Sequence, residues 1–196
     1  MNQQIFSKFN VYDQIGYLLV GSIGLLVIYL DAVLLSYEFP KFDLKTAIIW
    51  LIVAYFLGHV IQAVANVFIK EKKEDFNEQE REILKTAEEF FGIKVLSEGE
   101  IWNLCYMTAL AKDITGQINS FNAYYSLYRG WLMIFTIESA FLLVCVILSF
   151  SLPTMIWLIV SSLLVVLFYR RSKRFYNYLR AKVLQTFLII KTLKLQ

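Results

Sequence analysis

Four long apolar runs dominate the pattern of hydrophobic and polar positions in this 196-residue chain. A membrane-spanning helix needs about 20 predominantly apolar residues, with a range of about 17–25. The first three runs reach that length, and the fourth does so if its helix begins near Leu152 or extends to Arg170. The runs cover residues 14–37, 46–69, 131–152 and 154–169. This pattern predicts an all-α integral membrane protein with four transmembrane helices, arranged as two hairpins.

The connection between the second and third runs carries two amphipathic patterns, each preceded by a helix-start signal. Asn77 with Glu80, and Ser97 with Glu100, have the spacing of a capping box. Residues 117–129 are expected to lead helically into the third span. The apolar positions at helical spacing are Ile83, Leu84, Ala87, Phe90 and Phe91 in the first pattern, and Ile101, Leu104, Cys105 and Thr108 in the second. About 60 residues are few for an independent core, so we expect another subunit or the C-terminal tail to cover these stripes.

The chain after the fourth run is basic and amphipathic, with eight Lys and Arg and no Asp or Glu in residues 170–196. It fits a positive-inside signal combined with helix packing, or a helix on an anionic leaflet. RNA binding also fits the charge, but no motif requires it. The apolar positions are Phe175, Leu179, Val183, Phe187 and Ile190, and the basic ones include Arg170, Arg171, Lys173, Arg174, Arg180 and Lys182.

The distribution of Lys and Arg predicts the topology. Eight of the 19 lie in residues 70–129 and eight follow residue 169. Positive charge in short flanking segments favours the cytoplasmic side. We therefore expect a multi-pass protein of the cell's inner (plasma) membrane with both termini in the cytoplasm. Its parts would be a first hairpin (1–69), a cytoplasmic helical insert (70–129), a second hairpin (130–169) and a tail helix (170–196).

Polar residues inside the spans are the candidate functional positions. The second span has four on one helix face, spaced by 4, 3 and 4 residues: Tyr55, His59, Gln62 and Asn66. In the third span, Glu138 lies roughly 12 Å from the cytoplasmic end, and His59 lies roughly 15 Å from the same side. We expect these two to pair, either as a contact between packed helices or as part of an aqueous pathway or gate. Asp31 is nearer the outer end of the first span and is expected to reach the interface.

Small residues and cysteines add little chemistry. Gly16, Gly21 and Gly24 in the first span are expected to allow close approach of another helix. Cys105 and Cys145 are expected to be small apolar fillers and not a disulfide. Hydrophobic residues make up 58% of the chain and the mean hydropathy is +0.57, whereas a soluble domain is about 45–50% apolar.

Motifs of catalysis are absent from the sequence. There is no Gly-x-Ser-x-Gly elbow, His-Glu-x-x-His or phosphate-binding loop. One histidine and one buried acid make a poor set of metal ligands. We therefore expect no enzymatic activity, no cofactor and no metal. The absence of an obvious internal repeat also disfavours an inverted-repeat transporter.

Two stretches, YDQIGYLLVGSIGLL in the first span and YFLGHVIQA in the second, together resemble small four-span bacterial membrane proteins found beside antiphage defence genes. Among these, the chain is most similar to the four-span membrane accessory proteins of type VI-B CRISPR–Cas systems. The resemblance implies a non-enzymatic modulator of an RNA-guided nuclease, or a membrane-perturbing component of phage defence. The residues that carry it are Tyr12, Asp13, Gly16, Gly21, Tyr55, Gly58, His59 and Gln62.

Three functions follow in order of preference. The first is an oligomeric, pore-forming or membrane-perturbing protein of bacterial defence, whose partners are the lipid bilayer and copies of itself. The second is a membrane-anchored scaffold that recruits a cytoplasmic effector such as a nuclease. The third is a small transporter, which the sequence supports least.

Overall fold

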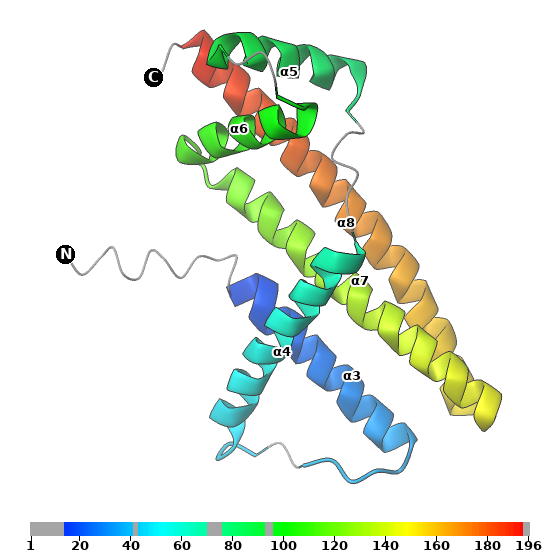
Figure 1. Ribbon diagram of the computed structural model, residues 1–196. Helices are drawn as coiled ribbons and strands as arrows, with labels where there is room; N and C mark the ends of the chain where they lie inside the picture. The colour runs from blue at the N-terminus through cyan, green and yellow to red at the C-terminus, as the bar shows by residue number, and fades with distance from the viewer. Residues whose placement is uncertain (1–13, 41–42, 70–75, 93–95, 194–196) are drawn as a thin grey trace. The chain divides into compact units, whose positions relative to one another are not determined.

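The computed structural model describes residues 14–40, 43–69, 76–92 and 96–193. The protein is 85% helical, and no strand occurs among these residues, so the all-α prediction is confirmed. The elements, shown in Figure 1, are η1 (Gln14–Leu19, a π-helix), α3 (Val20–Leu34), α4 (Ala47–Phe68), α5 (Glu78–Phe91), α6 (Glu98–Ala111), α7 (Gln117–Leu148) and α8 (Leu152–Thr192).

Four helices in the described part of the chain are long and apolar enough to cross a membrane: Gly16–Leu34, α4, α7 and α8. The protein is therefore a multi-pass membrane protein. The fourth span begins at Leu152, which gives it the required length, and residues 117–129 belong to α7 as predicted. The basic tail is no separate helix but the continuation of α8, because neither glycine nor proline occurs after Pro153 to interrupt it.

The chain forms two compact units, each described here by itself. The first, the membrane unit, comprises residues 1–69 and 123–175. The second, the insert–tail unit, comprises residues 70–122 and 176–196. The membrane unit also includes residues 123–129 and 170–175. The sequence pattern placed these two segments in the insert and the tail.

Glycines set the packing of the membrane unit. An added Cβ on Gly21 would lie 1.6 Å from the carbonyl oxygen of Ala54, and one on Gly58 would lie 1.9 Å from that of Tyr17. At these two positions α4 therefore crosses the first span in backbone contact, as Figure 1 shows. The close approach predicted for Gly21 is confirmed, while Gly16 has only an ordinary contact, 3.6 Å from the Ser126 hydroxyl oxygen.

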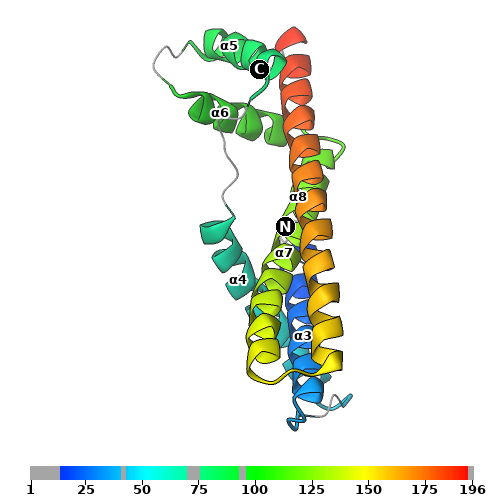
Figure 2. The ribbon, with the colours of Figure 1, turned by 90° about the vertical axis from the view of Figure 1, so that its right-hand side faces the viewer.

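A third contact of this kind joins α7 to the first span. An added Cβ on Gly130 would lie 2.7 Å from a methyl carbon of Val20, which is fully buried. Gly24 is less tight, because the nearest atom to its added Cβ is the flexible end of Ile61 at 3.0 Å. In the same unit α7 and α8 lie side by side (Figure 2), with Phe168 packed against Trp131 at a ring separation of 5.2 Å.

The insert–tail unit has its own hydrophobic core. Both capping boxes form as predicted: the Asn77 side chain accepts from the Glu80 N–H at 2.8 Å, and the Ser97 N–H donates to Glu100 at 2.8 Å. Gly92 ends α5 with a left-handed φ of 67°. The core joins α5, α6, the first turn of α7 and the end of α8, and includes Leu84, Ala87, Ile101, Trp102, Cys105, Ala109, Ile118, Leu179, Val183, Leu184 and Phe187.

The tail covers the apolar stripe of α5, which was one of the two partners expected from the sequence. Phe187 is fully buried, and its ring packs against Phe90 and Phe91 at 5.6 Å each. Ala87 is fully buried as well. Phe90 remains 39% exposed, so the tail covers this stripe only in part.

Candidate intramembrane site

An acidic pair lies inside the membrane unit. The side chain of Glu138 on α7 lies against the carboxyl of Asp31 on α3 and the indole of Trp157 on α8. Glu138 is 4% exposed and Asp31 is half-buried. One oxygen of each carboxyl and Nε1 of Trp157 are buried and have no aligned hydrogen-bond partner. Three helices therefore bring two acids and one N–H donor together at a place where none is fully satisfied.

This pair corrects one expectation drawn from the sequence. Asp31, near the end of the first span, has Glu138 as its neighbour. Glu138 in turn is not the partner of His59, because His59 stacks on Tyr17, fourteen residues before Asp31 along the first span. At about 1.5 Å per residue that separation is roughly 20 Å, so His59 and Glu138 occupy different depths.

The equal depths expected for His59 and Glu138 were counted from the cytoplasmic ends of α4 and α7. These two ends do not lie at the same level in the membrane unit. Gln62 touches Gly130, since a Cβ added to Gly130 would lie 2.8 Å from Gln62 Nε2. His59 lies three residues from that level and Glu138 lies eight residues from it. Glu138 therefore lies five residues further from that level than His59 does, so residue counts taken from the ends of the spans do not place the two side chains at one depth.

The polar stripe of α4 divides into three environments. His59 stacks on Tyr17 with ring centroids 3.7 Å apart and meets Tyr55 edge-on at 4.6 Å, which agrees with the expected common face of Tyr55 and His59. Asn66 is exposed. Gln62 is 4% exposed and is the stripe's interhelical contact.

Gln62 joins three segments of the membrane unit. Its Nε2 donates to the carbonyl oxygens of Gly16 at 3.2 Å and Ser126 at 2.8 Å. Its Oε1 accepts from Arg129 at 3.4 Å. Gly16 lies in the π-helix η1, where the i→i+5 pattern departs from the α-helical ladder, and the amide satisfies this backbone carbonyl.

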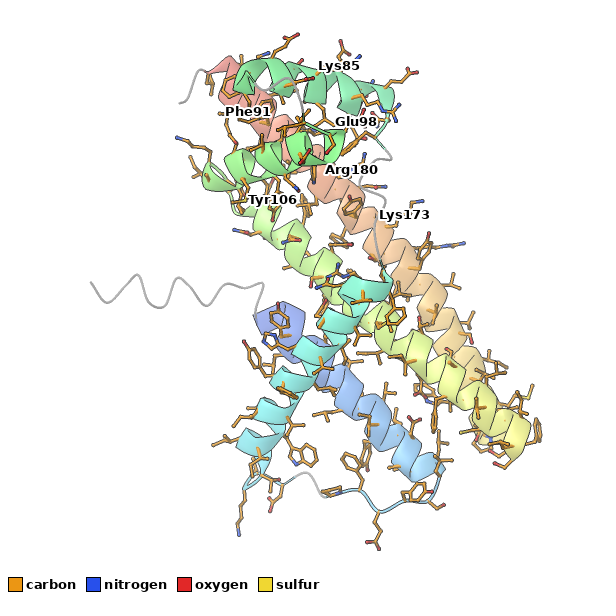
Figure 3. The ribbon with its side chains drawn as sticks, in the orientation of Figure 1. Lys85, Phe91, Glu98, Tyr106, Lys173 and Arg180 are labelled. Atoms are coloured by element: carbon orange, nitrogen blue, oxygen red, sulfur yellow. The ribbon has the colours of Figure 1, made fainter. Side chains whose placement is uncertain are left out.

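Basic residues of the tail also separate into groups. Arg170, Arg171, Lys173 and Arg174 are exposed and Lys182 is half-buried. Arg180 is 7% exposed, forms an ion pair with Glu80, and lies over the ring of Phe76 at 4.5 Å. It was predicted as part of a basic surface, and instead it is buried within the insert–tail unit, where Figure 3 labels it.

Two titratable groups of the insert–tail unit have a pKa that their surroundings shift. Burial raises the pKa of the Cys105 thiol to about 12, so it stays protonated and unreactive. Hydrogen bonds from the Ser97 side chain and backbone lower the pKa of Glu100, as its capping role requires. No cluster of three or more metal-ligating side chains occurs among the residues that the structure describes.

Comparison of the chain with protein-family models, curated proteins and solved structures found no match. The interpretation of function therefore depends on the site itself and on the resemblance described above.

Proposed function

We propose that this chain is a non-enzymatic protein of the bacterial inner membrane that changes membrane permeability as a homo-oligomer, as an accessory of an antiphage, CRISPR-associated system. The observation that carries the permeability proposal is the acidic pair of Asp31 and Glu138 inside the spans. The defence context rests on the resemblance alone. Several copies are required because one four-helix subunit has little room to enclose an aqueous path.

The energetics of the pair favour a functional role. A carboxylate within a span is costly, up to about 2.5–3.5 kcal/mol at the centre of the span on the insertion scale, and such residues mark ion or proton pathways by default. Two like charges about 4 Å apart repel by about 4 kcal/mol at an effective dielectric of about 20. Asp31 and Glu138 therefore need a shared proton or a bound cation to remain together on packed helices.

A mechanism follows from this requirement. With a proton or cation between them, the two carboxyls hold α3 against α7. When that ion leaves, repulsion between two desolvated carboxylates drives the helices apart and hydrates the space between them. Trp157, on the third helix, supplies an N–H donor beside Glu138. In this mechanism the pair is a gate that responds to ion occupancy.

Ion flux through proteoliposomes tests the proposal. Purified protein should increase the release of a trapped ion, and Glu138→Gln and Asp31→Asn should each change the rate or its dependence on pH. Glu38→Gln, at an exposed acid in the connection between α3 and α4, is the matched control and should behave as wild type. Wild-type protein that leaves flux at the level of empty liposomes, in an assembled and helical state, would contradict the proposal.

The insert–tail unit favours a second candidate function, a scaffold that recruits a cytoplasmic effector. Its core joins segments far apart in sequence, from Phe76 to Phe187, and α6 exposes Met107 at 63%. A folded unit of this kind can present a surface to a nuclease or another protein. Pull-down of a defined effector by the full chain, lost on Met107→Asp with flux unchanged, would support the scaffold over the permeability function.

A further inference from the structure

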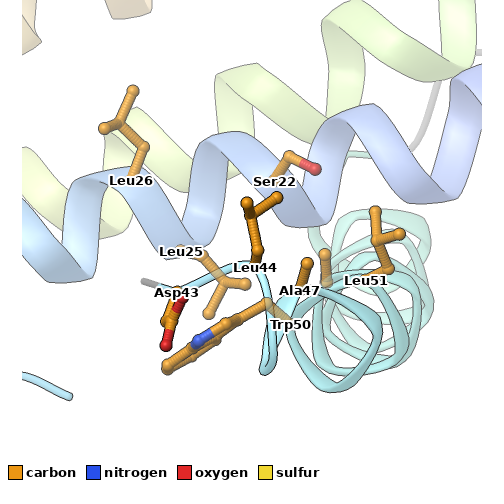
Figure 4. Close-up of a pocket in the computed structure, with 9 residues that line it drawn as sticks. Ser22, Leu25, Leu26, Asp43, Leu44, Ala47, Trp50 and Leu51 are labelled. Atoms are coloured by element: carbon orange, nitrogen blue, oxygen red, sulfur yellow. The ribbon is translucent and has the colours of Figure 1, made fainter. Parts of the chain in front are cut away.

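The membrane unit contains a groove that the acidic pair does not use. It lies between α3 and α4, with Asp43 and Leu44 of the connection also in its lining, and its volume is about 600 Å³ (Figure 4). The helices touch at Gly21 and Gly58 and diverge from there towards the connection, as Figure 1 shows. The lining residues are Ser22, Leu25, Leu26, Asp43, Leu44, Ala47, Trp50, Leu51 and Ala54.

The walls of the groove suit a hydrocarbon chain. Most of the lining side chains are aliphatic, and the polar ones are Ser22, Asp43 and Trp50. A space lined in this way does not hold ordered water, because water needs two to four polar partners. Both helices are membrane spans, so the groove faces a medium of lipid acyl chains.

The end of the groove near the connection has the character of a membrane interface. Phe39 stacks on Trp50 at 5.6 Å and meets Tyr29 edge-on at 5.5 Å, and aromatic rings gather at headgroup depth. At this end the carboxylate of Asp43 enters the lining. Lys45 is exposed two residues further along the chain. The aromatic end of the groove therefore has an acid, Asp43, in its lining and a base, Lys45, two residues further along the chain.

These charges complement a zwitterionic lipid better than they complement a second copy of the chain. The spans contain no Lys or Arg at all in residues 14–40, 46–69 and 130–169, so a span of another copy would bring no cation to the Asp43 carboxylate. A lipid headgroup that carries an ammonium and a phosphate matches Asp43 and Lys45 at once. A primary ammonium also donates N–H bonds to the carboxylate, which a quaternary ammonium cannot do.

We propose that this groove binds one acyl chain of an aminophospholipid, whose primary ammonium pairs with Asp43 and whose phosphate lies near Lys45. The site is independent of the acidic pair and of the permeability function. Because the glycine contact lies at one end of the groove and Asp43 and Leu44 lie at the other, the bound lipid would fill the space between α3 and α4 and support their crossing.

Native mass spectrometry of the full chain in detergent tests this site. The protein is titrated with phosphatidylethanolamine, phosphatidylcholine and phosphatidylglycerol of identical acyl chains. Phosphatidylethanolamine should bind roughly five-fold more tightly than the other two, as expected for one partly solvated charge pair. Equal binding of all three lipids would overturn the headgroup assignment and with it the proposal.

Two variants with matched controls locate the lipid. Asp43→Asn should abolish the preference for phosphatidylethanolamine, whereas Glu38→Gln, at another acid of the same connection, should keep it. Ala47→Phe should fill the groove and remove the bound lipid, whereas Ala63→Phe on the exposed face of α4 should not. Circular dichroism and a monodisperse profile confirm that each variant is folded. Unchanged lipid binding in Ala47→Phe overturns the proposal, and a dimer mass that this variant abolishes assigns the groove to a second copy instead.

Discussion

Gln62 on α4 donates a hydrogen bond of 2.8 Å from Nε2 to the backbone carbonyl of Ser126 on α7. The same nitrogen donates to Gly16 at 3.2 Å, so one amide joins both neighbouring helices to α4. The only histidine of the chain, three residues earlier, has a different role, because it packs its ring on Tyr17. The polar residue that holds these spans together is thus the glutamine.

We expect Gln62→Leu to destabilise the membrane unit by about 1–3 kcal/mol, because the carbonyls of Gly16 and Ser126 lose their side-chain donor in a buried place. Thermal unfolding in detergent, followed by circular dichroism, measures the change. Asn66→Leu is the matched control, since Asn66 lies on the same helix and is exposed. Equal melting temperatures for the two variants would show that the amide contributes nothing to packing.

Glycine substitutions should separate backbone contacts from open positions. Gly58→Ala and Gly21→Ala place a Cβ less than 2 Å from a carbonyl oxygen of the other helix, so the crossing of α3 and α4 must open. Gly16→Ala, with its nearest neighbour at 3.6 Å, is expected to be tolerated. The yield of folded, monodisperse protein after extraction in detergent decides this. Normal yields of Gly58→Ala would show that the two helices are further apart than the glycine contact requires.

Breaking the ion pair of Arg180 and Glu80 should destabilise the insert–tail unit far more than breaking an exposed pair does. Removing one partner of a buried pair costs about 3 kcal/mol, whereas an exposed pair contributes about 1 kcal/mol or less. Arg180→Ala should therefore increase hydrogen exchange of the α5 amides in the full chain. Arg81→Ala is the control, because it removes a pair with Glu98 whose side chains are 50% and 43% exposed. Equal exchange in both variants would contradict a structural role for Arg180.

The spans and the caps could be predicted because they depend on neighbouring residues. The apolar runs gave four helices of sufficient length, and the spacing of Asn77 with Glu80 gave a capping box that forms. The apolar face of the tail was also predictable, since Leu179, Val183 and Phe187 are all buried. In each of these cases the information lies within about ten residues of one segment.

The acidic pair could not be predicted, because its formation depends on how far one helix slides along another. That register is set by the close contacts of Gly58 and Gly130. The sequence does not indicate which residue of another helix each glycine contacts. Arg180 did leave a signal: it lies four residues before Leu184 and seven before Phe187, on the apolar face of α8. The charge of Arg180 alone does not show that its side chain lies on this apolar face.

Burial of Cys105 leads to a pH-dependent prediction. Its pKa is raised from 9.0 to about 12, so the folded protein keeps a proton that the unfolded chain releases. The resulting stability is present below about pH 9 and is lost as the pH rises towards 12. We expect unfolding to become easier over this range, and less so in Cys105→Ala. In a Cys145→Ala background, a maleimide should label Cys105 only after denaturation, and rapid labelling of the native protein would contradict its burial.

Cysteine accessibility in intact cells tests the topology that the charges predict. The short connection after α3 carries few basic residues, whereas eight follow residue 169, so the connection should face outward and the tail should face the cytoplasm. In a background with Cys105→Ala and Cys145→Ala, a membrane-impermeant maleimide should label Glu38→Cys but not Asn177→Cys, and both positions are exposed. After permeabilisation both should react, which controls for reactivity. The opposite pattern would show that the topology is inverted and that the Asp43 end of the groove lies on the cytoplasmic side.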